Sequence, residues 1–209
     1  LTPVYVGLTD KYDAKWIVII ASISVCLACF SLWFFAVGFW STCLIWGVVG
    51  SGLAGTYMPG LQVLNERLNM TDRVKLTPWY TSSFGLSNGI SFAVIGYLFA
   101  NFSWKIACYT TSISAALSAI IILFLTTSHN QKKNITERKF FDLRPAFKNK
   151  EALGYIFSYG THTYELFAYR AWIFTFLLWA SLRTPNTISS ELISLIIGIF
   201  MFIGMVSSL

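Results

Sequence analysis

The sequence predicts an all-α protein, a polytopic bundle of transmembrane helices in which six membrane-spanning segments are visible. Two numbers support this prediction: 56% of the residues are hydrophobic and only 11% are charged. The apolar residues also gather into runs long enough to cross a bilayer. Soluble domains are about one quarter charged, so this chain has too few polar groups to cover a surface that faces water. We therefore expect lipid to be its natural solvent.

Each of the six apolar segments is long enough to cross about 30 Å of hydrocarbon at about 1.5 Å per residue. The segments are residues 16–37, 41–64, 77–100, 104–127, 152–181 and 189–209. A membrane strand would alternate with period two over about ten residues, whereas these runs are apolar on every face. Helices are therefore the predicted spanning form.

Basic residues are divided unequally between the two sides of the predicted membrane. Twelve lie in the loops of one side, only Lys105 and Arg183 lie on the other, and Arg170 falls within a segment. Because cytoplasmic loops carry an excess of Lys and Arg, we predict that the side with twelve faces the cytoplasm. The net charge of +6 is then a topology signal, which points to a lipid bilayer as partner and not to nucleic acid.

A long basic stretch, residues 128–150, predicts a cytoplasmic connector that contains a short interfacial helix. Residues 1–127 would end one helical bundle, with four transmembrane helices, and residues 151–209 would start a second with two. Position 1 is not Met and an apolar run reaches Leu209, so we expect the middle part of a longer protein. All four cysteines fall in apolar runs, where free cysteine behaves as a small hydrophobe; we expect neither a cofactor nor a metal.

Small residues recur at close spacing in the second and third segments. In lipid, such residues let helix backbones approach one another. We interpret this set as helix-packing positions: Gly47, Gly50, Gly52, Gly55, Gly85 and Gly89. Pro59 is expected to bend the second segment, and Pro78 is expected in the first turn of the third helix.

The stretch VGLTDKYDAK, residues 6–15, resembles a cytoplasmic motif of the major facilitator superfamily of secondary transporters, Gly-x-x-x-Asp-Arg/Lys-x-Gly-x-Arg/Lys. Asp10, Lys11 and Lys15 fall on the charged positions of that motif. Val6 and Asp13 stand where the motif has glycines. The resemblance implies a charged gating motif on the cytoplasmic side.

Two further stretches extend the resemblance in the order that the family has them. WGVVGSGLA, residues 46–54, is similar to the fourth-helix pattern Arg-x-x-x-Gly-x-Gly-x-Ala, with Trp46 at the arginine position. In DRVK, Arg73 matches a basic residue that the family often carries after that helix, and it would join the gating motif. The visible segments would then be helices three to eight of twelve, packed against the remaining helices of the same protein.

The stretches YMPGLQ, residues 57–62, and HTYELFAYRAW, residues 162–172, also resemble a bacterial branch loosely grouped with cyanate permeases. That resemblance implies the bacterial inner membrane as the location. The family as a whole implies alternating access, in which two bundles rock about a site near the midplane.

The fifth segment carries three ionisable residues, His162, Glu165 and Arg170. Each charge at the bilayer centre costs about 2.5–3.5 kcal/mol, and such residues mark substrate or ion pathways by default. His162 and Glu165 share one helical face, whereas Arg170 lies about 140° around from Glu165. We predict that Glu165 binds a proton or a cationic group, that His162 titrates beside it and that Arg170 attracts an anion. Polar tips or stacking surface would come from Tyr57, Asn88, Tyr164, Tyr169 and Trp172.

These features predict a secondary active transporter of a small solute, coupled to a proton or another ion. Three alternatives remain: a polar network that only locks helices together, a membrane sensor or assembly protein without transport, and an intramembrane enzyme. The enzyme is disfavoured because H162-x-x-E165 offers two metal ligands where a site needs three or four. The sequence also lacks H-E-x-x-H and phosphate-loop motifs.

Overall fold

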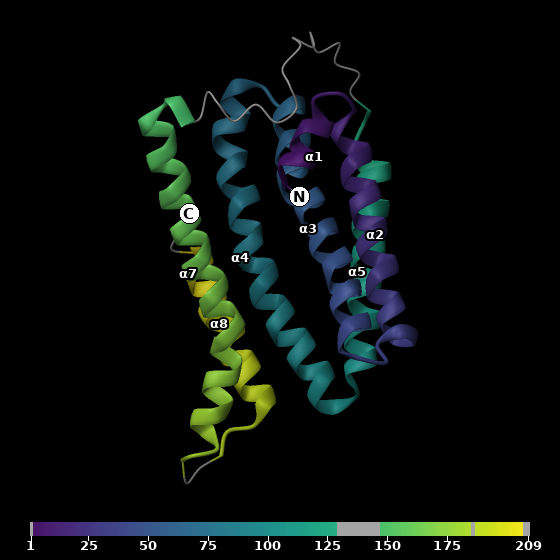
Figure 1. Cartoon of the computed structure of the whole chain (residues 1–209), viewed down its shortest axis with the longest axis vertical. Helices are drawn as coiled ribbons and strands as arrows, with labels where there is room; N and C mark the ends of the chain where they lie inside the picture. The colour runs from purple at the N-terminus through teal and green to yellow at the C-terminus, as the bar shows by residue number, and fades with distance from the viewer. Residues whose placement is uncertain (1, 129–146, 185–186, 207–209) are drawn as a thin grey trace. The chain divides into compact units, whose positions relative to one another are not determined.

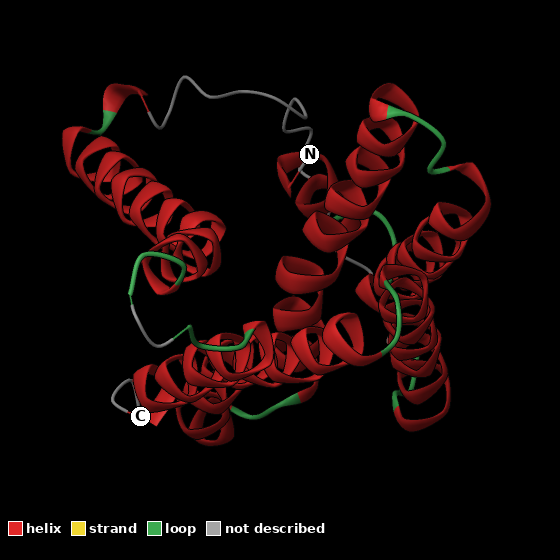
Figure 2. Cartoon of the chain, turned by 90° about the horizontal axis from the view of Figure 1, so that it is seen from below, coloured by secondary structure: helices red, strands yellow, loops and turns green. Residues whose placement is uncertain are grey.

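The computed structural model describes residues 2–128, 147–184 and 187–206, and every regular element among them is an α-helix (Figures 1 and 2). The all-α class predicted from the sequence is confirmed. Each predicted segment forms one helix: α2 (Ala14–Phe35), α3 (Phe39–Arg67), α4 (Met70–Asn101), α5 (Trp104–Leu125), α7 (Lys150–Ser181) and α8 (Ser190–Val206).

Two helix starts differ from the sequence prediction. A helix α1 (Thr2–Thr9) precedes the six, and its 8 residues are too few to register as a membrane segment. Helix α4 begins at Met70 rather than at residue 77. Its first two turns are polar, so the apolar run that predicted the helix starts later than the helix itself. Pro78 therefore lies inside the helix, and the prediction that it stands in the first turn is wrong.

Among the described residues, three helices are long and apolar enough to cross a membrane: α2, α4 and α5. The apolar part of α8, Ser190–Gly204, is shorter. Helices α3 and α7 are 29 and 32 residues long, but glycine and hydroxyl residues in α3 and ionisable residues in α7 make them less apolar. That α3, α7 and α8 also cross the membrane stays a prediction.

The helices group into two compact units. The first holds α1, α2, α3, α5 and the part of α4 outside Gly85–Tyr97; the second holds Gly85–Tyr97 with α7 and α8. Residues 129–146, most of the predicted connector with its interfacial helix, lie outside the described residues. The division of the chain at residues 128–150 therefore stays a prediction.

Helix α2 is the centre of the first unit. It packs against both α3 and α5, and α1 packs on α2 and α3 (Figure 1). Glycines of α3 allow the close approach to α2: a Cβ on Gly52 would overlap the Val25 side chain and lie 3.0 Å from the Ala21 backbone oxygen, and one on Gly55 would lie 2.8 Å from the Ala21 Cβ. The buried apolar residues of α2 are Ala14, Ile17, Val18, Ile19, Ala21, Ala28, Cys29 and Leu32.

Not every predicted packing glycine has a neighbour. A Cβ on Gly47 or Gly50 would meet nothing within 4 Å. Gly85 is half-buried on α4. Of the predicted packing glycines of α3, Gly52 and Gly55 therefore lie against α2, whereas Gly47 and Gly50 do not.

In the second unit, α4 and α8 touch backbone to backbone. A Cβ on Gly89 would lie 2.8 Å from the Gly198 carbonyl oxygen, and a Cβ on Gly198 would lie 2.8 Å from the Gly89 carbonyl oxygen. Farther along α4, Gly96 leaves space for the buried Ser194. The absence of a Cβ at both positions allows this close approach of the two helices.

Candidate functional site

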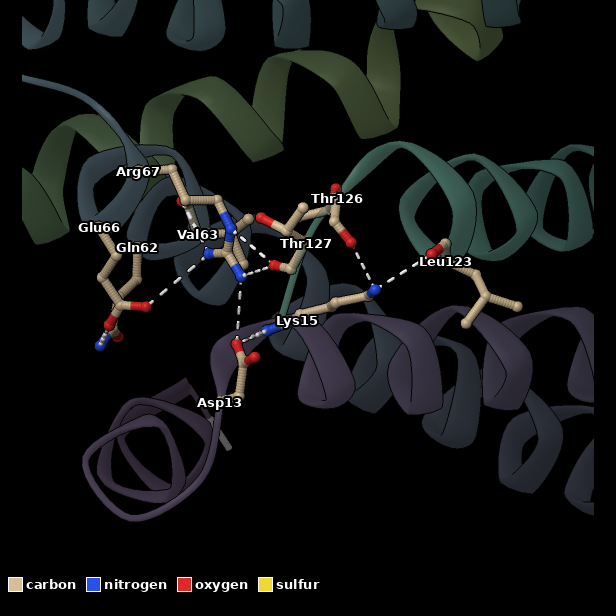
Figure 3. A network of polar contacts seen from close by, with 9 residues as sticks. All are labelled: Asp13, Lys15, Gln62, Val63, Glu66, Arg67, Leu123, Thr126 and Thr127. Carbon is tan, nitrogen blue, oxygen red and sulfur yellow. Dashed lines mark hydrogen bonds and ion pairs between the residues drawn. The ribbon is translucent and has the colours of Figure 1, made fainter. Parts of the chain in front are cut away.

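A polar network joins three helix ends of the first unit (Figure 3). Asp13 is the N-cap of α2, and its Oδ1 accepts a hydrogen bond from the Lys15 backbone N at 2.9 Å. The same Oδ1 lies 3.4 Å from Nη2 of Arg67, which stands in the last turn of α3. Arg67 also donates to the Thr127 carbonyl, from Nη2 at 2.7 Å and from Nε at 3.1 Å. One arginine thus links the start of α2, the end of α3 and the chain just beyond α5.

Lys15 makes the second link between these helix ends. Its side chain is 6% exposed, and its ammonium donates to the Leu123 carbonyl at 3.1 Å and to the Thr126 carbonyl. The last carbonyls of a helix have no partner within the helix, and they carry partial negative charge. Lys15 therefore supplies donors that the C-terminal end of α5 lacks.

The sequence placed Asp10, Lys11, Lys15 and Arg73 in a charged gating motif. Of these four, Lys15 lies in the network of Figure 3. Asp10 and Lys11 are exposed in the turn between α1 and α2, and Arg73 is half-buried in the first turn of α4.

Sequence reasoning missed the pair Asp13 and Arg67. An aspartate directly before an apolar run is an N-cap signal, and an arginine in the last turn of α3 is where a cation is favoured. Because α2 and α3 follow one another and both are predicted to cross the membrane, the start of α2 and the end of α3 would lie at the same end. Those signals together could have found the pair.

The two ends of the first unit differ in chemistry. The end described above carries Lys15 and Arg67. At the opposite end, where α2 finishes and α5 begins, the Lys105 ammonium lies 5.5 Å from the Trp33 ring centroid and 5.8 Å from that of Trp104. Trp is enriched where a membrane meets water, and a cation above its ring is attracted to it.

A cavity of about 540 Å³ opens in the first unit among α3, α5 and the start of α4. The candidate residue Tyr57 lines it together with Tyr80; their ring centroids are 5.8 Å apart, and the Tyr80 hydroxyl donates to the Tyr57 carbonyl at 2.8 Å. Gly60 makes room for this contact, since a Cβ there would overlap the Tyr80 hydroxyl. Arg67 also lines the cavity, which therefore reaches the polar network.

Helix α7 of the second unit carries the ionisable candidates. Nδ1 of His162 lies 3.8 Å from Oε2 of Glu165, and the two side chains are 69% and 81% exposed. Tyr169 and Trp172 are exposed on the same helical face, while Arg170 is half-buried. The structure thus brings His162 and Glu165 together and leaves both accessible.

The remaining candidates lie elsewhere. Tyr164 is exposed on α7, and Asn88 is half-buried on the α4 part of the second unit. Within the described part of the chain, no group of three or more His, Cys, Asp or Glu side chains could hold a metal ion.

Comparison with known proteins identifies the family to which the chain belongs. The model of the Major Facilitator Superfamily matches residues 1–209, which include every helix described above. Searches of curated proteins and of solved structures found no match. Because the family model covers the entire chain, and because its members are transporters built from membrane helices, the chain belongs to the major facilitator superfamily and is an integral membrane transporter.

Proposed function

We propose that this transporter is a secondary active one, which moves a small solute by alternating access and couples that movement to a proton or another ion. The His162–Glu165 pair carries the proposal. Two titratable side chains 3.8 Å apart, each more than two-thirds exposed on one face of α7, are costly in lipid unless they face a wet cavity or a partner. A transporter uses such a pair to bind and release its cargo.

The two side chains have complementary roles in this proposal. The Glu165 carboxylate holds a proton or a cationic group, and the His162 imidazole contacts the same bound group. Nδ1 of His162 and Oε2 of Glu165 are 3.8 Å apart, so one ligand can reach both side chains. Loading of the site with a proton and loading with solute are thereby linked.

The moving parts are the two bundles predicted from the sequence, residues 1–127 and 151–209, joined by the connector at 128–150. We place the end that carries Lys15 and Arg67 in the cytoplasm, because basic residues favour that side. We also propose that the protein lies in the bacterial inner membrane and that further helices of the same protein pack against those described above. The polar network at that end, with Asp10, Lys11 and Arg73 near it in sequence, would favour one state of the cycle.

The Glu165→Gln variant tests this function. The chain is reconstituted in liposomes that contain a pH-sensitive dye, and gradients of small amines, carboxylates and sugars are imposed in turn. For the solute that drives proton movement in the wild type, we expect the Gln variant to lose about tenfold or more of the proton flux, because the group that exchanges the proton is gone. Glu151→Gln, in the exposed first turn of the same helix, should retain the flux.

Wild-type flux with unchanged pH dependence in Glu165→Gln would remove the residue from the mechanism. Two other results would point to the alternatives. Ligand binding without flux for any solute would indicate a sensor, and product formation without a gradient would indicate an enzyme.

A further inference from the structure

The His162–Glu165 pair lies in the middle of an exposed stripe that runs along α7. Residues seven positions apart on a helix point in directions that differ by only about 20°, so they form a column along the helix, and two neighbouring columns form one face. Every member of these columns is exposed. One column is Tyr155, His162, Tyr169 and Phe176, and its neighbour is Ser158, Glu165, Trp172 and Trp179.

The middle of this stripe carries an acidic side chain, and the Arg183 guanidinium lies at its end. Glu165 supplies a carboxylate, whereas the His162 beside it is charged only when protonated. Arg170 lies about 140° around the helix from Glu165 and is half-buried. A positively charged ligand is therefore complementary to the part of the stripe around Glu165.

The aromatic members favour a cation with an organic body. Tyr169 and Trp172 are one and two turns along the helix from Glu165, and both rings are exposed. The faces of such rings attract ammonium and guanidinium groups, Trp most strongly. They also offer a flat apolar surface for the uncharged part of a ligand.

The chain itself supplies an example of this recognition on the same stripe. The Arg183 guanidinium carbon lies 4.4 Å from the ring centroid of Trp179, and that ring stacks on Phe176 with centroids 6.1 Å apart. A cation thus already occupies a tryptophan face at the end of the stripe. Trp172, seven residues earlier in the same column and two turns from Glu165, is exposed as well.

We propose that this stripe binds a small organic cation, with the ammonium group near Glu165 and the apolar body against Tyr169 and Trp172. This inference deepens the proposed function, on which it rests, because it names the chemical class of the solute. Glu165 supplies the charge complementarity, and the two rings supply the selectivity for an organic ion over a metal ion.

Titration calorimetry on the purified full chain in lipid nanodiscs tests the inference. The probe is benzyltrimethylammonium, and its uncharged isostere neopentylbenzene is the comparison ligand. We expect the cation to bind at least about tenfold more tightly than the isostere, since only the cation gains the carboxylate and the ring faces. Glu165→Gln should weaken binding of the cation about tenfold or more, while Glu165→Asp, which keeps the charge, should retain most of it.

Trp172→Leu should lower the affinity for the cation about three- to tenfold, as expected for the loss of one desolvated ring face. Two matched controls should bind as the wild type does: Glu151→Gln, which removes an exposed carboxylate from the same helix, and Trp40→Leu, which removes an exposed tryptophan from α3. Circular dichroism shows whether each variant keeps its helices.

Equal affinity for cation and isostere, or unchanged affinity in folded Glu165→Gln, overturns the inference. The proposed function has a separate readout. If binding depends on Glu165 but a gradient of the cation moves no protons in liposomes, the cation site stands and coupled transport falls. If another solute is transported while the cation does not bind, the proposed transport function stands and only the proposal of an organic cation as solute is contradicted.

Discussion

Replacing Gly52 by valine should lower the melting temperature of the purified chain by about 5–10 °C. A Cβ at this position would overlap the Val25 side chain and lie 3.0 Å from the backbone oxygen of Ala21. Val25 can change rotamer, but the backbone of α2 cannot yield without moving the central helix of the first unit. Overpacking of this kind costs about 1–3 kcal/mol or more, and each kcal/mol lowers the melting temperature of a chain of this length by about 2–4 °C.

Two positions of the same helix supply matched controls. A Cβ on Gly47 or Gly50 meets nothing within 4 Å, so Gly47→Val and Gly50→Val change helix propensity without adding a clash. Thermal unfolding followed by size-exclusion chromatography should separate Gly52→Val from both. Equal melting temperatures for all three variants would mean that α3 does not lie against α2 at Gly52.

Replacing Lys15 by methionine should lower the free energy of unfolding by about 2–3 kcal/mol. Methionine keeps the apolar stem of the buried side chain, but it removes the ammonium that donates to the Leu123 and Thr126 carbonyls. Hydrogen bonds to a charged group contribute about 1.5–3 kcal/mol each, and the two carbonyls would remain in a partly buried place without that donor. The end of α5 should then fray.

Hydrogen exchange checks this prediction at the level of one helix end. Amides in the last turns of α5 should exchange faster in Lys15→Met, while amides in the middle of α2 and α5 should change less. Lys75→Met is the control, since Lys75 is exposed near the start of α4. If Lys15→Met and Lys75→Met have the same stability and the same exchange in α5, the ammonium of Lys15 does not hold that helix end.

The sequence located the helices well, because a run of apolar residues is a property of one segment alone. The sequence prediction missed helical residues that do not belong to a long apolar run. The first turns of α4 carry Asp72, Arg73 and Lys75, and the eight residues of α1 are too few to span a membrane. The start of α4 is too polar, and α1 is too short, to be found by the long apolar runs that identified the other helices.

The candidate sites were harder to predict, because they depend on pairing between distant residues. His162 and Glu165 are three residues apart, so helical periodicity alone placed them on one face, where the structure has them 3.8 Å apart. Asp13 and Arg67 are separated by most of two helices, and only the antiparallel packing of α2 and α3 brings them within 3.4 Å. Lys15 was selected as one charge of a surface motif, whereas its carbonyl partners on α5 could not be read from that motif.

The contact between Gly89 and Gly198 has a consequence for how these helices can evolve. In most packed helix pairs, a larger side chain on one helix is tolerated once a smaller one replaces its neighbour. Here each glycine lies against the carbonyl oxygen of the other, and both are already the smallest residue available. No smaller residue at the facing position can restore the lost space, so a change at either glycine requires one of the two helix backbones to shift.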